Sequence, residues 1–372
     1  MQYSIPDLAE RIQDFTNTVV SPNIIKWERD HEACRSFLTE AAKRGLLGLE
    51  TPASSGGMGA GFLDKMLMAR EMSQSSMAVV FSVINSQNIA VRMAASARTR
   101  HRAEIAPLLR SAELVGCTAL TEPHAGSDFA AIKTSAVKVT GGWRLNGSKA
   151  WITNAAHADI IMLYAQTDPE KGWKGIASFM VDARRGGFRR GKIYDLIGGH
   201  PIGAGEFHLE DYIAPEEDML APPGEAFKIA MNSINGARTY VAAMCAGMIQ
   251  DALRKSVAYG KERQSFGAPL LQHQGLKWSL ADVATQLECL DLLTLKAGQR
   301  IVDGEDAVLP AAMAKKLAGD ITIPALTACL QAMGANGLKE ENGLGHHLVC
   351  AKIAAYTDGS TEMMNERIAA AF

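Results

Sequence analysis

Two short segments between residues 117 and 154 decide the fold: Cys-Thr-Ala-Leu-Thr-Glu-Pro-His-Ala-Gly-Ser-Asp (117–128) and Asn-Gly-Ser-Lys-Ala-Trp-Ile-Thr-Asn (146–154). The first segment is a short extended run broken by Pro123, followed by a turn in which Gly126 lets a planar or anionic ligand approach the backbone. The second alternates around an Asn-Gly pair, which predicts a hairpin turning at residues 146–147. A large aromatic beside hydroxyl residues could flank a flat ring system. An ordinary β domain with a core tryptophan is the alternative.

Hydrophobic periodicity on either side of these segments predicts an α+β fold. Helical spacing runs from residue 7 to 95, a period of two from 113 to 220, and helical spacing again from 226, with helices expected over 226–260, 275–303, 308–333 and 362–371. We therefore expect an N-terminal helical domain (1–112), a middle antiparallel β domain (113–222) and a C-terminal four-helix bundle (223–372).

Composition narrows the function classes. The chain has 372 residues, 47% of them hydrophobic, and a net charge of −2, which gives no basic footprint for nucleic acid. Its 6 cysteines are scattered without CxxC spacing, so a disulfide framework or zinc site is not expected and a reducing cytoplasm is the predicted location. We find no signal-peptide pattern and no apolar run long enough for a membrane span.

Leu-Thr-Glu-Pro-x-Ala-Gly-Ser-Asp followed by Asn-Gly-x-Lys-x-Trp-Ile-Thr-Asn resembles the paired signature of the acyl-CoA dehydrogenase family, and the likeness extends from about residue 47 to 371. The resemblance implies FAD as cofactor, an acyl-CoA substrate, a homo-oligomer (dimer or tetramer), and an electron-transferring flavoprotein as oxidant. A nicotinamide site is not supported, since no Gly-x-Gly-x-x-Gly follows a strand.

The resemblance also implies the flavin contacts. They come from the first segment, from the second, from the Lys-Glu-Arg-Gln-Ser-Phe-Gly stretch with the His-Gln after it, from Gln-Ala-Met-Gly, and from the last helix: Thr118, Leu120, Thr121, Gly126, Ser127, Trp151, Ile152, Thr153, Arg263, Ser265, Phe266, His273, Gln274, Gln331, Gly334, Ser360 and Glu362. In the family, the third and fourth groups reach the flavin of a neighbouring subunit. Arg263 suits a pyrophosphate because its guanidinium presents a planar donor fork; a surface ion pair with Glu262 or Asp251 is the alternative.

The catalytic base is expected at Asp358, which falls where most family members have a glutamate in Tyr-Glu-Gly-Thr. The alternative is a plain turn before the final helix, with Ser360 as N-cap. The family's other location for the base, just before Arg238, carries Ala237 here. The resemblance makes Ser127, Arg238 and Gly359 substrate contacts. An aspartate base would need burial to raise its pKa.

The sequence is also compatible with other functions. The substrate could be an acyl group on an acyl carrier protein, or the chain could be a flavin-dependent monooxygenase or a scaffold with vestigial activity. The adjacent His346 and His347 are interpreted as a loop pair and not as a metal site, because they lack an i, i+4 partner.

Overall fold

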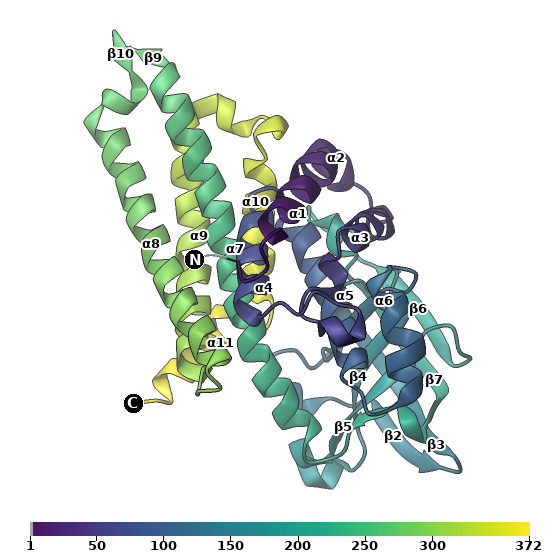
Figure 1. Cartoon of the computed structure of the whole chain (residues 1–372). Coiled ribbons are helices and arrows are strands. Elements are labelled where there is room, and N and C mark those ends of the chain that lie inside the picture. Colours follow the sequence, from purple (N-terminus) through teal and green to yellow (C-terminus); the bar gives the residue numbers. More distant parts are fainter. Residues whose placement is uncertain (1–2) are drawn as a thin grey trace.

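The structure, a computed structural model, describes residues 3–372. In chain order a β-sheet follows an N-terminal helical region and precedes a C-terminal one, and in space it lies at one end of the molecule (Figure 1). The N-terminal region contains helices α1 (Leu8–Phe15), α2 (Ser21–Trp27), α3 (Ala33–Lys43), α4 (Phe62–Met72), α5 (Met77–Ala94) and α6 (Ala106–Arg110). Local chemistry sets where these helices begin. Ser76 caps α5 by accepting a hydrogen bond from the Val79 N–H, and Asp64 accepts one from the Gly61 N–H at the start of α4.

The middle region is an eight-stranded sheet. Its strands are β1 (Gly116–Ala119), β2 (Ser135–Val139), β3 (Gly142–Ile152), β4 (Ile160–Gln166), β5 (Ile176–Asp182), β6 (Phe188–Ile193), β7 (Gly205–Pro215) and β8 (Met219–Ala221). The order is β6-β7-β3-β2-β4-β5-β8, and β1 pairs with β4. Most neighbours are antiparallel, as predicted, although β1 and β2 run parallel to β4.

The hairpin predicted at Asn146–Gly147 is wrong. Both residues lie inside β3, which is continuous, and the turn between β2 and β3 falls at residues 140–141. The pairing of β3 with β7 shifts register between Leu145 and Gly147, which marks a bulge. Asn146 exchanges two hydrogen bonds with Asp211 of β7, and a Cβ on Gly147 would lie 2.7 Å from the Thr134 Cα. Tertiary contacts have therefore overridden the local turn signal.

The C-terminal region is built on three long helices, α7 (Ala226–Glu262), α8 (Gln274–Val302) and α9 (Val308–Met333), which pack against one another (Figure 1). Two shorter helices, α10 (Leu344–Tyr356) and α11 (Thr361–Ala369), pack against α9. The four predicted helices match α7, α8, α9 and α11 to within two residues at each end. The pattern missed α10. The short strands β9 (Gln264–Ser265) and β10 (Ala268–Pro269) form a hairpin at the far tip, between α7 and α8.

Buried apolar side chains hold these regions together. One cluster joins the N-terminal helices to α7, α9 and α10, and two smaller clusters lie on the sheet. Among the helices of residues 3–372, none combines the length and the apolar character that crossing a membrane requires. The α+β class predicted from the sequence is confirmed.

Candidate active site

Asp358 lies in the short connection between α10 and α11, in the left-handed backbone region with φ +56°. One carboxylate oxygen, Oδ2, is buried and has no hydrogen-bond partner among the described residues. Burial raises the pKa of Asp358 from an ordinary value of 3.8 to about 6. The positive charges of Lys315 and Arg238 act in the opposite direction but do not outweigh burial. The result is a carboxylate that is ionised near neutral pH and has an oxygen free to accept a proton.

Two buried cations hold the Asp358 connection in place. The Nε of Arg238, on α7, donates to the Asp358 carbonyl at 3.1 Å, and its Nη1 donates to Asn235 at 3.2 Å. The Nζ of Lys315, on α9, lies 3.5 Å from the Gly359 carbonyl. Burial lowers the pKa of both side chains, and Asp358 acts in the opposite direction on each. Lys315 was not predicted, because only the packing of α9 against the connection brings it here.

A polar cluster extends from this point toward α4 and α5. Burial, and after it the charge of Asp358, raises the pKa of Tyr240 on α7, whereas the Asn88 side chain of α5 acts to lower it. The Nζ of Lys65 lies 5.6 Å from the centre of the Tyr240 ring and is ion-paired with Glu50. Asp358 therefore has ionisable and amide groups among its neighbours as well as apolar ones.

The two signature segments lie side by side. The Ala150 N–H donates to the Thr121 carbonyl at 3.1 Å, and the buried Lys149 Nζ donates to the Leu120 carbonyl at 3.0 Å. Lys149 also contacts Glu122 at 2.8 Å. Although burial opposes ionisation, Lys149 holds the pKa of Glu122 below its ordinary value, helped by the backbone N–H groups of residues 133 and 134. This buried pair fixes the first segment against β3.

The face formed by these segments fits a flat ring. Trp151 is 61% exposed although it has φ +60°, and its ring packs on Tyr194 with 4.4 Å between centroids. A Cβ at Gly126 would meet nothing within 4 Å, and the Thr118 N–H is fixed by Asn85 at 3.2 Å. An exposed aromatic face near an open loop of small residues offers a surface on which a flat ring can stack. Ile152 is buried, and Ser127 and Thr153 belong to the same two segments.

The third and fourth predicted groups lie together elsewhere, at the tip of the long helices. The Arg263 N–H donates to the Tyr259 carbonyl at the end of α7, and the Asn336 side chain donates to the Tyr259 hydroxyl at 2.9 Å, which joins the ends of α7 and α9. Phe266 is 97% exposed, and its ring is perpendicular to that of His273 with 6.2 Å between centroids. This end carries Arg263, Ser265, Phe266, His273, Gln274, Gln331 and Gly334. No ion pair of Arg263 is found within residues 3–372, so the surface-pair alternative has no support.

The tip is far from Asp358 within one chain. Arg238, which contacts Asp358, and Arg263 are 25 residues apart along α7, or about 37 Å at the rise of an α-helix. Ser360 caps α11 by accepting from the Met363 N–H, as the turn alternative predicted, and Glu362 is exposed on its first turn. The cap and the buried carboxylate of Asp358 therefore coexist.

The loop interpretation of His346 and His347 is wrong, because both lie in α10. His346 pairs with Glu28 at 2.7 Å, and His347 pairs with Asp251 at 3.0 Å. The two side chains point to different carboxylates, so they do not converge on one ion. The apolar pattern of α10 is weak, which explains why periodicity missed this helix.

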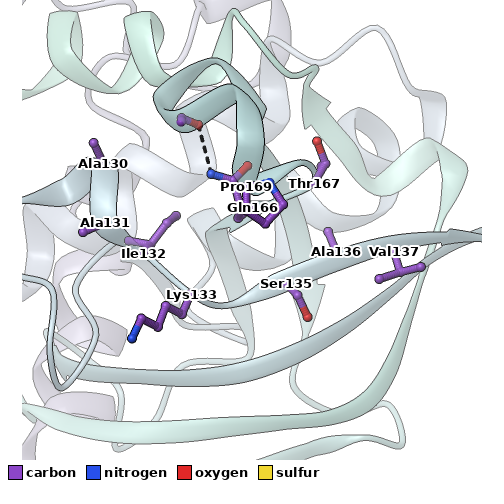
Figure 2. A pocket seen from close by; sticks show the side chains of 11 residues that line it. Ala130, Ala131, Ile132, Lys133, Ser135, Ala136, Val137, Gln166, Thr167 and Pro169 are labelled. Carbon is purple, nitrogen blue, oxygen red and sulfur yellow. Dashed lines mark hydrogen bonds between the residues drawn. The ribbon is translucent and has the colours of Figure 1, made fainter.

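A cavity of about 440 Å³ lies on the sheet domain, away from these groups (Figure 2). Its lining comes from residues 130–133 and 135–137, from the end of β4 and from the connection after it, and the Gln166 side chain at the end of β4 donates to the Gly172 carbonyl at 2.9 Å. A second cavity lies between α1, α4 and α7. None of the predicted site residues lines either cavity.

Comparison with known proteins identifies the family. Models of the acyl-CoA dehydrogenase N-terminal, middle and C-terminal domains match residues 6–113, 117–212 and 224–372. The chain belongs to the acyl-CoA dehydrogenase family. These proteins are FAD-dependent oxidoreductases, so the predicted family, enzyme class and cofactor are confirmed.

Three relatives illustrate the likeness. The short-chain specific acyl-CoA dehydrogenase of Megasphaera elsdenii is 32% identical over 96% of this chain and 94% of its own. The structure of butyryl-CoA dehydrogenase from the same organism superposes with a TM-score of 0.91 at 31% identity, over 98% of this chain and 97% of that one. A chain in a structure described as the electron transferring flavoprotein of Acidaminococcus fermentans has a TM-score of 0.92 at 30% identity, over 98% and 96%.

Proposed function

We propose that this acyl-CoA dehydrogenase removes the α-proton of an acyl-CoA thioester with Asp358, with transfer of the β-hydride to FAD. The environment of the Asp358 carboxylate supports this role. Asp358 is half-buried, its pKa is raised to about 6, and its buried Oδ2 has no partner among the described residues. A general base is most effective when its pKa lies near the working pH and its lone pair is free.

The groups around Asp358 would orient this step. Arg238 fixes the backbone of the connection through the Asp358 carbonyl, and Gly359 has φ +102°, with room for no Cβ because one would lie 2.9 Å from the Met364 Cε. The Gly359 N–H would donate to the thioester oxygen as enolate charge develops. Aspartate is one methylene shorter than the usual glutamate, so the α-carbon would bind closer to the backbone.

The signature segments would hold the flavin. Trp151 and Thr153 would contact the flavin ring. The open loop at Gly126 and Ser127 would let an edge of the ring approach the backbone. Bound FAD supplies the hydride acceptor that no amino-acid side chain provides. The cations and amides at the tip, led by Arg263, would bind the pyrophosphate.

The tip would serve the flavin of a second copy of the chain, because it lies so far from Asp358. Large apolar side chains are exposed near the tip, including Phe266 (97%), Leu338 (79%) and Trp278 (61%). Exposed apolar side chains gathered in this way indicate a protein interface. The enzyme would therefore be a homo-oligomer, a dimer or a tetramer. An electron-transferring flavoprotein would be its oxidant, in line with the Acidaminococcus fermentans relative.

Anaerobic titration tests the proposal. The FAD-loaded protein would be mixed with butyryl-, branched, cyclic and long-chain acyl-CoA esters while the oxidised flavin band is followed. We expect one class to bleach the flavin, and Asp358→Asn to slow the bleaching about 10²–10⁴-fold, the usual contribution of a general base. Asp282→Asn, an exposed aspartate on α8, is the matched control and should behave as the parent.

Two results would contradict the proposal. Full-rate bleaching by Asp358→Asn would remove the aspartate from the mechanism. A flavoprotein that no CoA ester bleaches would exclude free acyl-CoA as substrate and direct the search to carrier-bound acyl groups. Asp358→Glu separates geometry from chemistry, because it keeps a carboxylate and restores the longer side chain found in most of the family.

A further inference from the structure

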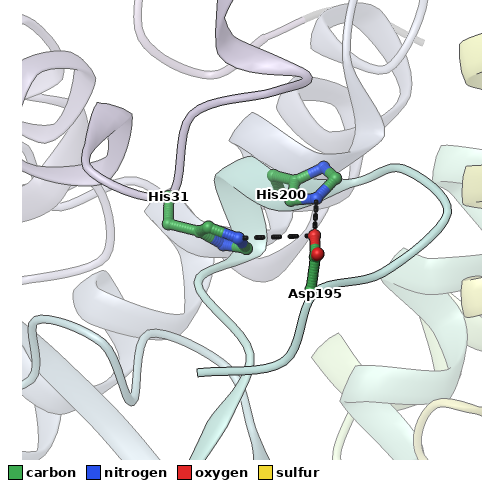
Figure 3. A group of neighbouring side chains, drawn as sticks. All are labelled: His31, Asp195 and His200. Atoms are coloured by element: carbon green, nitrogen blue, oxygen red, sulfur yellow. Dashed lines mark hydrogen bonds and ion pairs between the residues drawn. The ribbon is translucent and has the colours of Figure 1, made fainter. Parts of the chain in front are cut away.

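His31, Asp195 and His200 form a cluster outside the site described above (Figure 3). The His200 Nε2 lies 3.2 Å from the Asp195 Oδ1, and the His31 Nε2 lies 3.9 Å from the same oxygen. One potential ligand atom from each residue lies within 4.8 Å of the other two. His31 follows α2, whereas Asp195 and His200 lie in the connection between β6 and β7, so two regions distant in sequence meet here.

Hydrogen bonding accounts for one nitrogen of the His200 ring, through Asp195, and, within residues 3–372, for neither nitrogen of the His31 ring. The Nδ1 atoms of His31 and His200 are both buried, and neither has a hydrogen-bond partner in the described chain. The rings meet edge to face with 4.6 Å between centroids, and both Nε2 atoms point to the same carboxylate oxygen (Figure 3). Asp195 is 89% exposed, so the cluster opens to solvent on the carboxylate side.

The charges around the cluster favour a cation. Asp195 faces both rings, and Asp30 and Glu32 flank His31 in the chain. Glu28 accepts a hydrogen bond at 2.8 Å from the N–H of Gly199, the residue before His200, and also pairs with His346. Imidazole nitrogen and carboxylate oxygen are both ligands of divalent transition-metal ions.

We propose that His31, Asp195 and His200 bind a divalent transition-metal ion of the zinc class, with water completing the coordination. Zn²⁺ bonds of about 2.0–2.1 Å in a tetrahedral site place ligand atoms about 3.3 Å apart. The His200–Asp195 contact of 3.2 Å matches this separation, and the His31–Asp195 contact of 3.9 Å would shorten as the exposed Asp195 side chain moves toward the ion. Imidazole selects this class over Mg²⁺ and Ca²⁺, which prefer oxygen ligands.

The bound ion would act as a structural clamp. Its ligands belong to the segment after α2 and to the connection between β6 and β7, so it would tie the N-terminal helices to the sheet. None of the ligands is a predicted flavin or substrate contact. Metal binding would therefore raise stability without being needed for dehydrogenation.

Calorimetric titration of the FAD-loaded, tag-free protein with ZnCl₂ in a non-chelating buffer tests the site. We expect one ion per chain in the parent, and at least a tenfold loss of affinity in the double variant His31→Gln, His200→Gln. His208→Gln is the matched control, because His208 lies on the neighbouring strand β7 and bonds Ser148 instead. MgCl₂ should give no binding.

Thermal unfolding of the same proteins gives a second readout. Zinc should raise the unfolding temperature of the parent and of His208→Gln, but not of the double variant, which must first show the parent's flavin spectrum and metal-free stability. Absence of zinc binding by the parent would overturn the proposal. So would equal binding by the double variant, which would place the ion elsewhere, for example at the exposed Cys289.

Discussion

Replacing Asp358 by asparagine should make the protein more stable at neutral pH. The carboxyl titrates at about 6 in the folded chain and at about 3.8 when exposed. Between these values the unfolded chain binds fewer protons than the folded chain, so the free energy of unfolding falls as pH rises. Above pH 6 the folded chain carries the full free-energy cost of an ionised, desolvated carboxylate. The difference of about 2.2 pKa units corresponds to about 3 kcal/mol. Asparagine carries no charge and removes this cost.

Denaturant unfolding of the parent and of Asp358→Asn, at several pH values and fixed protein concentration, measures the effect. The linkage relation predicts a gain of about 3 kcal/mol for the variant at pH 7 and about 1 kcal/mol at pH 4.5. Asp282→Asn should show the same small difference at every pH, because this side chain is exposed.

The pH dependence is the decisive feature. A variant that is less stable than the parent at pH 7 would show that the carboxylate stabilises the fold, as in a structural turn. A gain that stays constant from pH 4.5 to 7 would show that its pKa is not raised. Either result would refute the argument that burial prepares Asp358 to accept a proton, independently of any substrate.

Three further substitutions test the surroundings of the site. Lys315→Met removes a positive charge that favours the ionised form of Asp358, so the pKa of Asp358 should rise. The pH midpoint of flavin bleaching should then rise by about one unit, which corresponds to about 1.4 kcal/mol of interaction between the two charges. Glu122→Gln should destabilise the fold by about 3–5 kcal/mol because it leaves Lys149 buried and unpaired, and adding Lys149→Met should recover much of that loss, as denaturant unfolding would show. Gly147→Ala should cost about 1–3 kcal/mol through overlap with a neighbouring backbone, whereas Gly186→Ala, which meets nothing within 4 Å, should be nearly neutral in the same assay.

Much of the fold was predictable because its signals are local. The long helices follow from periodicity, and the paired signature identified the family before any contact was known. The proposed domain boundaries stay a prediction; they fall in the connections before β1 and before α7. The hairpin prediction failed because Asn146 and Gly147 respond to Asp211 and Thr134, residues that only the folded sheet brings near.

The site was predictable in part for the same reason. Asp358 could be placed by its motif, but Lys315 and Tyr240 have no local signal, because their roles depend on how α7 and α9 pack around the connection. The His31 cluster likewise combines residues from separate segments, and no spacing in the sequence marks it.

The length of α7 has a genetic consequence. If the tip of one chain completes the flavin site of another, a chain damaged at Arg263 still offers an intact Trp151, and the reverse holds. Two inactive variants expressed together would then share their intact halves. With random pairing into dimers, half of the dimers would be mixed, and each of these would carry one complete site, so about a quarter of all sites would be active. Neither variant alone could reach that level.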